Sequence, residues 1–175
     1  MKKIATVLTL FVAALMFTSC DNKESLQEYL VKSQEKNDFM TFDIPVNFFK
    51  PKAGDVSQDV LETINSINKI NVVALPVKDN LEAYEAEKSK IKEILSDSDT
   101  YKSLMTMKYD GYNVKIYYTG EADAIDEVIA FGYAKDKGVG VARILGEDMN
   151  PAQIMKVANQ ITVDGKGMNL NQFSF

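Results

Sequence analysis

Three groups of residues in this sequence could carry chemistry, and the first is an acidic connection late in the chain. It holds four carboxylates, at Glu121, Asp123, Asp126 and Glu127. Carboxylate oxygens are the ligands that Ca²⁺ prefers. The spacing departs from the calcium loop of EF-hand proteins, because Ile125 stands at a ligand position of that loop and Asp126 at its glycine position. We therefore expect a solvated turn that holds no metal ion.

Paired carboxylates are the second group, since they can hydrolyse glycosidic bonds without any histidine. Such a site needs two carboxyl groups about 5 to 10 Å apart on either side of a cleft. The chain has 25 acidic residues, so some pair will meet that distance by chance. It has no tryptophan, which would offer a platform for stacking a sugar ring. A non-catalytic protein is therefore favoured over a carboxylate-dependent hydrolase.

The third group surrounds Arg143, the only arginine among the 20 basic residues. Strand alternation predicts that it shares one sheet face with small apolar residues, namely Ala130, Gly132 and Val141. Arginine offers a planar fork for a carboxylate or a phosphate, so this face could form a shallow anion-binding floor. The alternative is an internal ion pair with Asp126 or Glu147 beneath a helix. We favour the ion pair and keep Arg143 as a candidate ligand-binding residue.

Several common catalytic and metal sites are excluded by composition. The chain has no histidine, and its one cysteine is Cys20. Ser-His-Asp and Cys-His catalysis are therefore unavailable, as are zinc sites built on histidine or cysteine. No disulfide can form within the chain, so the fold must rest on its core. We expect no cofactor.

The first twenty residues have the pattern of a bacterial lipoprotein signal. Lys2 and Lys3 precede an apolar run over residues 4–17, which is shorter than the roughly 20 residues of a membrane-spanning helix. Thr18-Ser19-Cys20 resembles a lipobox, although Phe17 stands where that motif usually has leucine. We expect residues 1–19 to be a signal peptide and Cys20 to carry the lipid, palmitate included. The alternative is an ordinary signal peptide with an incidental cysteine.

Cleavage before Cys20 would leave residues 20–175 as a single lipid-anchored domain. Loss of the two lysines takes the net charge from −5 to −7, because 18 basic residues then face 25 acidic ones. An acidic surface argues against nucleic-acid binding and against attraction to anionic lipid head groups. Attachment to the membrane therefore falls to the acyl chains. We expect a cell-envelope location, at the outer membrane and facing either the periplasm or the surface.

Hydrophobic periodicity then predicts the elements that position these groups. Helices are expected at residues 22–36, 57–67 and 80–96, and strands at 38–44, 71–77, 104–109 and 112–119. Asp110-Gly111 favours a two-residue hairpin turn in which both residues have positive φ. Residues 126–151 form the central hairpin and the start of a last helix. Pairing Ala134 with Val139 across a turn at residues 135–138 sets large residues opposite small ones and places Arg143 opposite Ala130.

Four stretches carry a resemblance to a known family. They are CDNKESLQEY after the anchor, KINVVALPV, the acidic helix at 79–97, and IDEVIAFGYAKDKGVGVARILGEDMNP. The most specific pieces are IDE at 125–127 and RILGEDM at 143–149. Together they resemble a Bacteroidota lipoprotein family known as domain of unknown function 4252. The resemblance implies an envelope lipoprotein of the α+β class, and it implies no activity.

The sequence thus predicts an α+β domain in which a mostly antiparallel sheet of about six strands is covered by helices, with a ferredoxin-like arrangement as one candidate. The leading function is a non-catalytic envelope lipoprotein that binds a partner protein or a small ligand. The alternative is a carboxylate-dependent hydrolase acting on envelope glycans. A cleft with two facing carboxylates would favour the enzyme, whereas a groove without charged groups would favour the binding protein.

Overall fold

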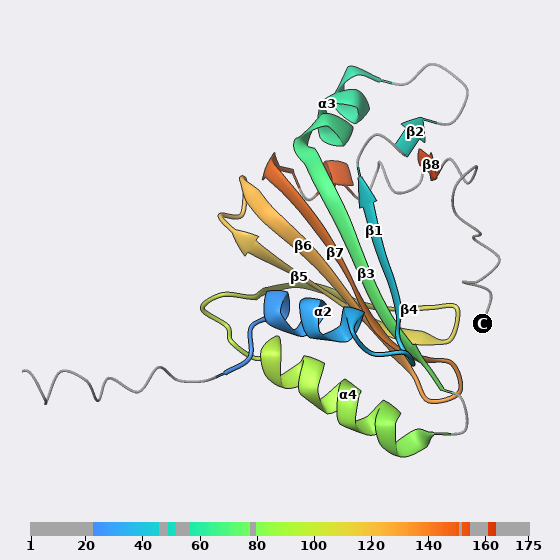
Figure 1. Cartoon of the computed structure of the whole chain (residues 1–175). Coiled ribbons are helices and arrows are strands. Elements are labelled where there is room, and N and C mark those ends of the chain that lie inside the picture. The colour runs from blue at the N-terminus through green and yellow to red at the C-terminus, as the bar shows by residue number, and fades with distance from the viewer. Residues whose placement is uncertain are drawn as a thin grey trace, which may run out of the picture.

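The structure of the chain, a computed structural model, describes residues 23–45, 49–51, 57–77, 80–150, 152–154 and 161–163. The expected signal peptide, Cys20 and the tail from residue 164 onward lie outside these ranges. The described chain has the expected α+β architecture, with a six-stranded antiparallel sheet and three helices of nine residues or more (Figure 1).

The sheet has the strand order β1-β3-β7-β6-β5-β4, and every neighbouring pair is antiparallel. Its strands are β1 (Met40–Pro45), β3 (Ile67–Pro76), β4 (Lys102–Tyr109), β5 (Tyr112–Gly120), β6 (Ile125–Ala134) and β7 (Gly138–Met149). A separate short pair joins β2 (Phe49–Pro51) to β8 (Ile161–Val163). Strands β4 to β7 follow one another as a meander, which the βαββαβ order of a ferredoxin-like fold does not contain. The ferredoxin-like candidate is therefore not the observed topology.

The three helices are α2 (Leu26–Gln34), α3 (Gln58–Ser66) and α4 (Leu81–Ile94), close to the predicted ranges. Two of them begin with a side-chain cap, which satisfies a backbone N–H that the first turn leaves without a partner. Ser25 Oγ accepts from the Glu28 N–H at 3.1 Å, and Asn80 Oδ1 accepts from the Ala83 N–H at 3.0 Å. Ser57 occupies the corresponding position of α3, but its side chain makes no capping bond.

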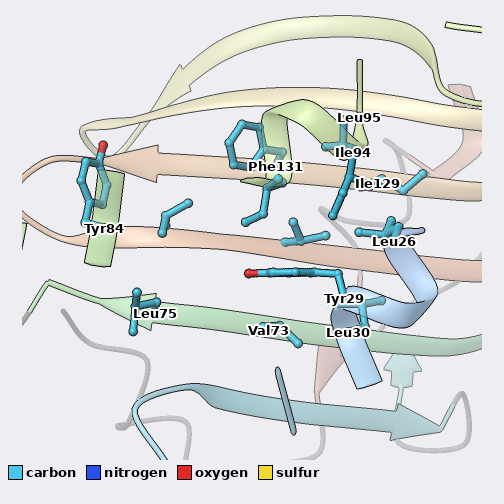
Figure 2. Close-up of a cluster of buried hydrophobic side chains, with 13 residues drawn as sticks. Leu26, Tyr29, Leu30, Val73, Leu75, Tyr84, Ile94, Leu95, Ile129 and Phe131 are labelled. Atoms are coloured by element: carbon cyan, nitrogen blue, oxygen red, sulfur yellow. The ribbon is translucent and has the colours of Figure 1, made fainter. Parts of the chain in front are cut away.

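Helices α2 and α4 lie side by side on one face of the sheet, which we call the covered face (Figure 1). Their apolar side chains meet those of β3, β6 and β7 in the main core, shown in Figure 2. Tyr29, Ile91, Ile129, Phe131 and Val141 are each at most 1% exposed. Burial of such side chains contributes about 1.5 to 3 kcal/mol each relative to exposure. The helices thus seal one face of the sheet.

The opposite face, which we call the open face, carries a smaller core at one end only. This second core contains Ile67, Ile116, Ile125, Val128, Met149 and Ile154. Helix α3 packs beside it against β3 and β7, and Thr63 of α3 donates to Gln153 Oε1 at 2.8 Å. Ile154, which follows the expected start of the last helix, is buried in this second core.

The two hairpin turns test the sequence prediction in different ways. Asp110 and Gly111 have φ values of 46° and 80°, so the predicted two-residue turn with positive φ is confirmed. The register of the β6–β7 hairpin was predicted wrongly by one residue, because Ala134 pairs with Gly138 and the turn has three residues. Lys137 donates its backbone N–H to the Ala134 carbonyl at 3.3 Å, which tightens the loop.

Candidate functional site

The one-residue register shift decides where Arg143 lies. Arg143 pairs with Ile129 and therefore shares the covered face with Phe131 and Val141, whereas Ala130 and Gly132 belong to the open face. The predicted grouping of Arg143 with Ala130 and Gly132 is corrected accordingly. The physical reason is the two-residue period of a strand, since a shift of one residue exchanges the faces.

Arg143 is held in a buried polar network, 8% exposed. Its guanidinium donates through Nε to Glu127 Oε2 at 3.0 Å and through Nη2 to Glu127 Oε1, and its Nη1 donates to Gln27 Oε1 on α2. The internal ion pair that we favoured is therefore present, with Glu127 as the partner in place of Asp126 or Glu147. The guanidinium donates these hydrogen bonds to Glu127 and Gln27, so Arg143 is not placed to receive an anion from solvent.

The open face contains an apolar groove of about 230 Å³ between the second core and the hairpin turns. Its floor is formed by small residues that alternate along the two central strands, at Ala130, Gly132, Gly140 and Ala142. Tyr112 and Val114 on β5 flank the floor on one side. On the other side Val72 of β3 lies beside Ala142, whereas Ala74 of β3 extends the floor of small residues beside Gly140. All thirteen lining residues are described, and Tyr112 alone among them has a polar side-chain group. The groove is therefore a hydrocarbon surface that water reaches.

The two glycines of the floor serve different purposes. A Cβ on Gly140 would lie 2.7 Å from the Val73 carbonyl oxygen, so close approach of the backbones requires glycine there. A Cβ on Gly132 would meet only the Tyr112 and Val114 side chains, at 3.9 and 4.0 Å. A larger side chain would therefore fit at position 132 without a clash, and the space that glycine leaves there is part of the groove.

The turn end of the groove is polar. Lys137 lies with its Nζ 5.3 Å from the centroid of the Tyr112 ring and forms an ion pair with Asp110 at 2.7 Å. The same Nζ donates to the Asp110 carbonyl at 2.7 Å. The opposite end is closed by bulkier residues of the next row, Ile70, Val128 and Ile144, where the second core begins. The groove therefore has one apolar closed end and one polar open end.

A second, larger cavity of about 440 Å³ lies where α2 begins and α4 ends, and acidic and basic side chains line it. It is lined by Glu24, Glu93 and Asp97 together with Lys23 and Lys90, among others. Burial raises the pKa of Glu24, but hydrogen bonds from Lys90 and Lys32 outweigh it, so the net pKa is lowered. A hydrogen bond from Thr100 lowers the pKa of Asp97. Both carboxyl groups are thus ionised at neutral pH, whereas a glycosidase needs an acid with a raised pKa.

The acidic connection does not gather its carboxylates. Glu121, Asp123 and Asp126 are exposed, whereas Glu127 points to Arg143. Within the described ranges no group of three or more carboxylates is arranged to hold a metal ion. The calcium loop considered from the sequence therefore has no geometric support in this part of the chain.

Cys20 lies outside the described residues, and the first described residue, Lys23, leads into α2 on the covered side of the sheet. In the described part of the chain, no helix has the length and apolar character needed to cross a membrane.

The groove could have been found from the sequence by one signal. Small residues recur at every second position in both central strands, at Ala130, Gly132 and Ala134 and again at Gly138, Gly140 and Ala142. The correct register sets the two series directly beside each other, which forms a floor of small residues two strands wide. The predicted register set each small residue against a large one and so concealed it.

Comparison with known proteins identifies a family, and the description of that family names no activity. No curated protein and no solved structure is significantly similar to the chain. The family model described as domain of unknown function, DUF4252, matches residues 29–157, which run from α2 past the end of β7 and cover most of the chain. The chain therefore belongs to the DUF4252 family.

Proposed function

We propose that the chain is a non-catalytic lipoprotein of the bacterial cell envelope, of the Bacteroidota type, which binds a partner protein or a small ligand on its open sheet face. The observation that carries this proposal is the apolar groove over Gly132 and Gly140. An apolar surface that stays in contact with water costs free energy, and such patches mark interaction sites in soluble domains. The groove lining carries no acidic or basic side chain, which supports binding over acid–base chemistry.

The membrane part of the proposal rests on the N-terminal sequence. Cys20 follows a short apolar run and stands at the expected cleavage point, and the domain after it is acidic. An acidic domain gains nothing from anionic lipid head groups, so the acyl chains on Cys20 would supply the attachment. The hydrolase alternative has weaker support, because Glu24 and Asp97 at the larger cavity have lowered pKa values.

Replacement of Cys20 tests the anchor. The Cys20→Ala variant should move from the membrane fraction to the soluble fraction of cells, because no other part of the chain is expected to hold it there. Metabolic labelling with radioactive palmitate should mark the parent and not the variant. A variant that still sediments with membranes after a high-salt wash would refute the lipoprotein proposal.

Photo-crosslinking in intact cells tests the binding face. A benzophenone amino acid replaces Val114 at the groove wall, and the matched control carries it in place of Ala86, which is exposed on α4. We expect an adduct at position 114 that is absent at position 86, with its mass measured by mass spectrometry. The adduct should disappear when Gly132→Leu fills the groove. Equal labelling at both positions would contradict the proposed site.

A further inference from the structure

We infer that the outer edge of β4 is a docking site for an extended segment of a partner protein, which adds to the sheet as one more strand and alternates acidic with apolar residues. This inference goes beyond the proposed function, because the edge of the sheet is a different surface from the groove. It follows from the exposure of β4, from the direction of its backbone groups, and from the unlike side chains on its two faces.

Strand β4 is the more accessible of the two edge strands of the sheet. Among the described elements it pairs with β5 alone, and six of its eight residues are exposed. The other edge strand, β1, contacts α2 and ends at Pro45, whose nitrogen has no hydrogen to donate. An exposed edge presents backbone N–H and C=O groups that another strand can pair with. The edge of β4 therefore offers a template for strand addition.

The backbone groups that face outward from β4 can be assigned from its register. The pairing of β4 with β5 is unbroken from Met105 to Tyr109. Residues that flank a two-residue hairpin turn form a hydrogen-bonded pair, and such pairs alternate with non-bonded ones along an antiparallel ladder. Counted from the pair of Tyr109 and Tyr112, this alternation directs the N–H and C=O of Thr106 and Lys108 away from β5. An added strand would pair with these two residues.

The side chains of Thr106 and Lys108 lie in a basic row on the covered face. Both residues are exposed, and Lys115 of β5 lies directly opposite Thr106. Neither lysine has an ion-pair partner within the part of the chain that the structure describes. Asp110, the nearest carboxylate to Lys108 along the chain, is held by Lys137 at 2.7 Å. Opposite charges on neighbouring strands stabilise a sheet, so this row favours acidic residues in the added strand.

The alternate residues of β4 form an apolar row on the open face. They are Met105, Met107 and Tyr109, of which Met105 is 37% exposed and Tyr109 is 69% exposed. Tyrosine and methionine are enriched where proteins meet. Apolar residues of an added strand would bury this row, because side chains alternate between the two faces. The two rows together select a segment that alternates acidic and apolar residues.

A second copy of the chain fits this edge poorly. Pairing of β4 with the β4 of another copy would bring the lysines of both copies into one row. The described residues of β4 and β5 on the covered face include no carboxylate that could neutralise them. Like charges on neighbouring strands destabilise the pairing, and lysine on an edge strand opposes self-association for that reason. The charge of the edge thus favours an acidic partner over another copy.

The experiment uses the mature protein as cells produce it, carried in phosphatidylcholine nanodiscs if Cys20 is lipidated, with empty nanodiscs as the blank. The probe is a fluorescent synthetic peptide in which valine and glutamate alternate. One comparison peptide has the same residues with its glutamates grouped together, and another has lysine in place of glutamate. Fluorescence anisotropy should show saturable binding of the probe and binding at least about tenfold weaker for both comparison peptides. No saturable binding, or equal binding of the grouped peptide, would overturn the inference.

Methylation of peptide nitrogens tests whether the probe adds as a strand. In the expected register the glutamate N–H groups point toward β4, whereas the valine N–H groups point away from it. N-methylation of the glutamates should therefore weaken binding at least about tenfold, and N-methylation of the valines should be tolerated. The two peptides have the same charge and the same number of methyl groups. Equal affinities would show attraction to a basic patch without strand addition and would overturn the inference.

A charge reversal tests the location. The edge variant Lys108→Glu/Lys115→Glu should prefer the lysine peptide over the glutamate peptide. The control Lys69→Glu/Lys135→Glu carries the same change of net charge outside β4 and β5, and should keep the preference of the parent. Circular dichroism checks that both variants are folded, and the methylated peptides still decide on the parent if the edge variant is not. An unchanged preference in a folded edge variant, or a reversed one in the control, would overturn the inference.

Other occupants give distinguishable results. Peptide binding that is lost in Gly132→Leu and kept in the edge variant would place the peptide in the groove, which overturns this inference and leaves the proposed function standing. A dimer in sedimentation that the edge variant dissociates would assign the edge to a second copy and overturn it as well. Peptide binding at the edge without any adduct at position 114 would support this inference and contradict the proposed binding face.

Discussion

The two faces of the same sheet are built on opposite principles. On the covered face, Phe131 and Val141 project large side chains into a core that α2 and α4 seal, with at most 1% exposure. On the open face, the alternate residues Gly132 and Gly140 project almost nothing, and a groove remains. Odd positions of these two strands therefore fill the core, whereas even positions leave the groove. Substitutions at neighbouring residues should therefore have very different consequences.

The largest difference between the faces should come from truncating Phe131. Phe131→Ala removes a fully buried ring from the main core and should lower the free energy of unfolding by about 3 to 5 kcal/mol. Met105→Ala is the control on the open face, where Met105 is 37% exposed, and should cost less than about 1 kcal/mol. Urea titrations followed by circular dichroism measure both. Similar costs would mean that the open face is sealed in solution.

The polar network of the covered face should give the next largest effect. Arg143→Met leaves the Glu127 carboxylate without its partner and should cost about 2 to 4 kcal/mol, somewhat below a fully buried pair because the Glu127 side chain is 18% exposed. The double variant Arg143→Met/Glu127→Leu should recover most of that loss, since no unpaired charge then remains. A double-mutant cycle measured by urea unfolding gives the coupling free energy between Arg143 and Glu127. Additive costs would show that the pair does not stabilise the fold.

The two floor glycines sharpen the comparison within the open face. Gly140→Ala should cost about 1 to 3 kcal/mol, because its methyl group meets the Val73 carbonyl oxygen. Gly132→Ala should be neutral or stabilising by up to about 1 kcal/mol, because alanine restricts the unfolded chain and the methyl group has space. Thermal unfolding midpoints distinguish the two. Equal losses would show that Gly132 is packed and that the groove floor is not free.

The smallest effect concerns pH and the ion pairs of Glu24. Its folded-state pKa lies below the usual 4.5, so ionised Glu24 stabilises the folded state above that pH and the contribution is lost as the pH falls through the lowered pKa. Unfolding free energy should therefore decline less steeply in acid for Glu24→Gln than for the parent. Urea midpoints between pH 3 and pH 6 measure this. Identical profiles would mean that Lys90 and Lys32 hold the carboxylate only weakly.

Most elements could be predicted from the sequence, because they depend on local patterns. The helix at 80–96 has an apolar stripe and a capping asparagine, and the structure has α4 at Leu81–Ile94. Asp110-Gly111 determines its turn through its own backbone preferences. The α+β class followed from these local elements. Strand order did not, because it depends on which distant segments meet.

The site was less predictable for one physical reason. Side-chain direction in a strand has a period of two, so a loop that is shorter by one residue exchanges the faces. A four-residue turn at 135–138 was expected, and the three-residue turn moved Arg143 away from Ala130. The existence of an ion pair followed from the chemistry of a lone arginine in an apolar strand. Its partner Glu127 depended on the register and could not be assigned beforehand.

The strand order also bears on how the chain folds. Strands β4 to β7 join through short turns, so Phe131 meets Val141 after little loss of chain entropy. Strand β3 must instead find β7 from a distant part of the chain, since Val73 pairs with Val141. Pairings between distant segments form slowly. We expect strands β4 to β7 to pair before β3 adds to them. Until β3 pairs with β7, the backbone groups at the β7 edge have no strand partner. That edge is therefore where two partly folded chains could pair with each other.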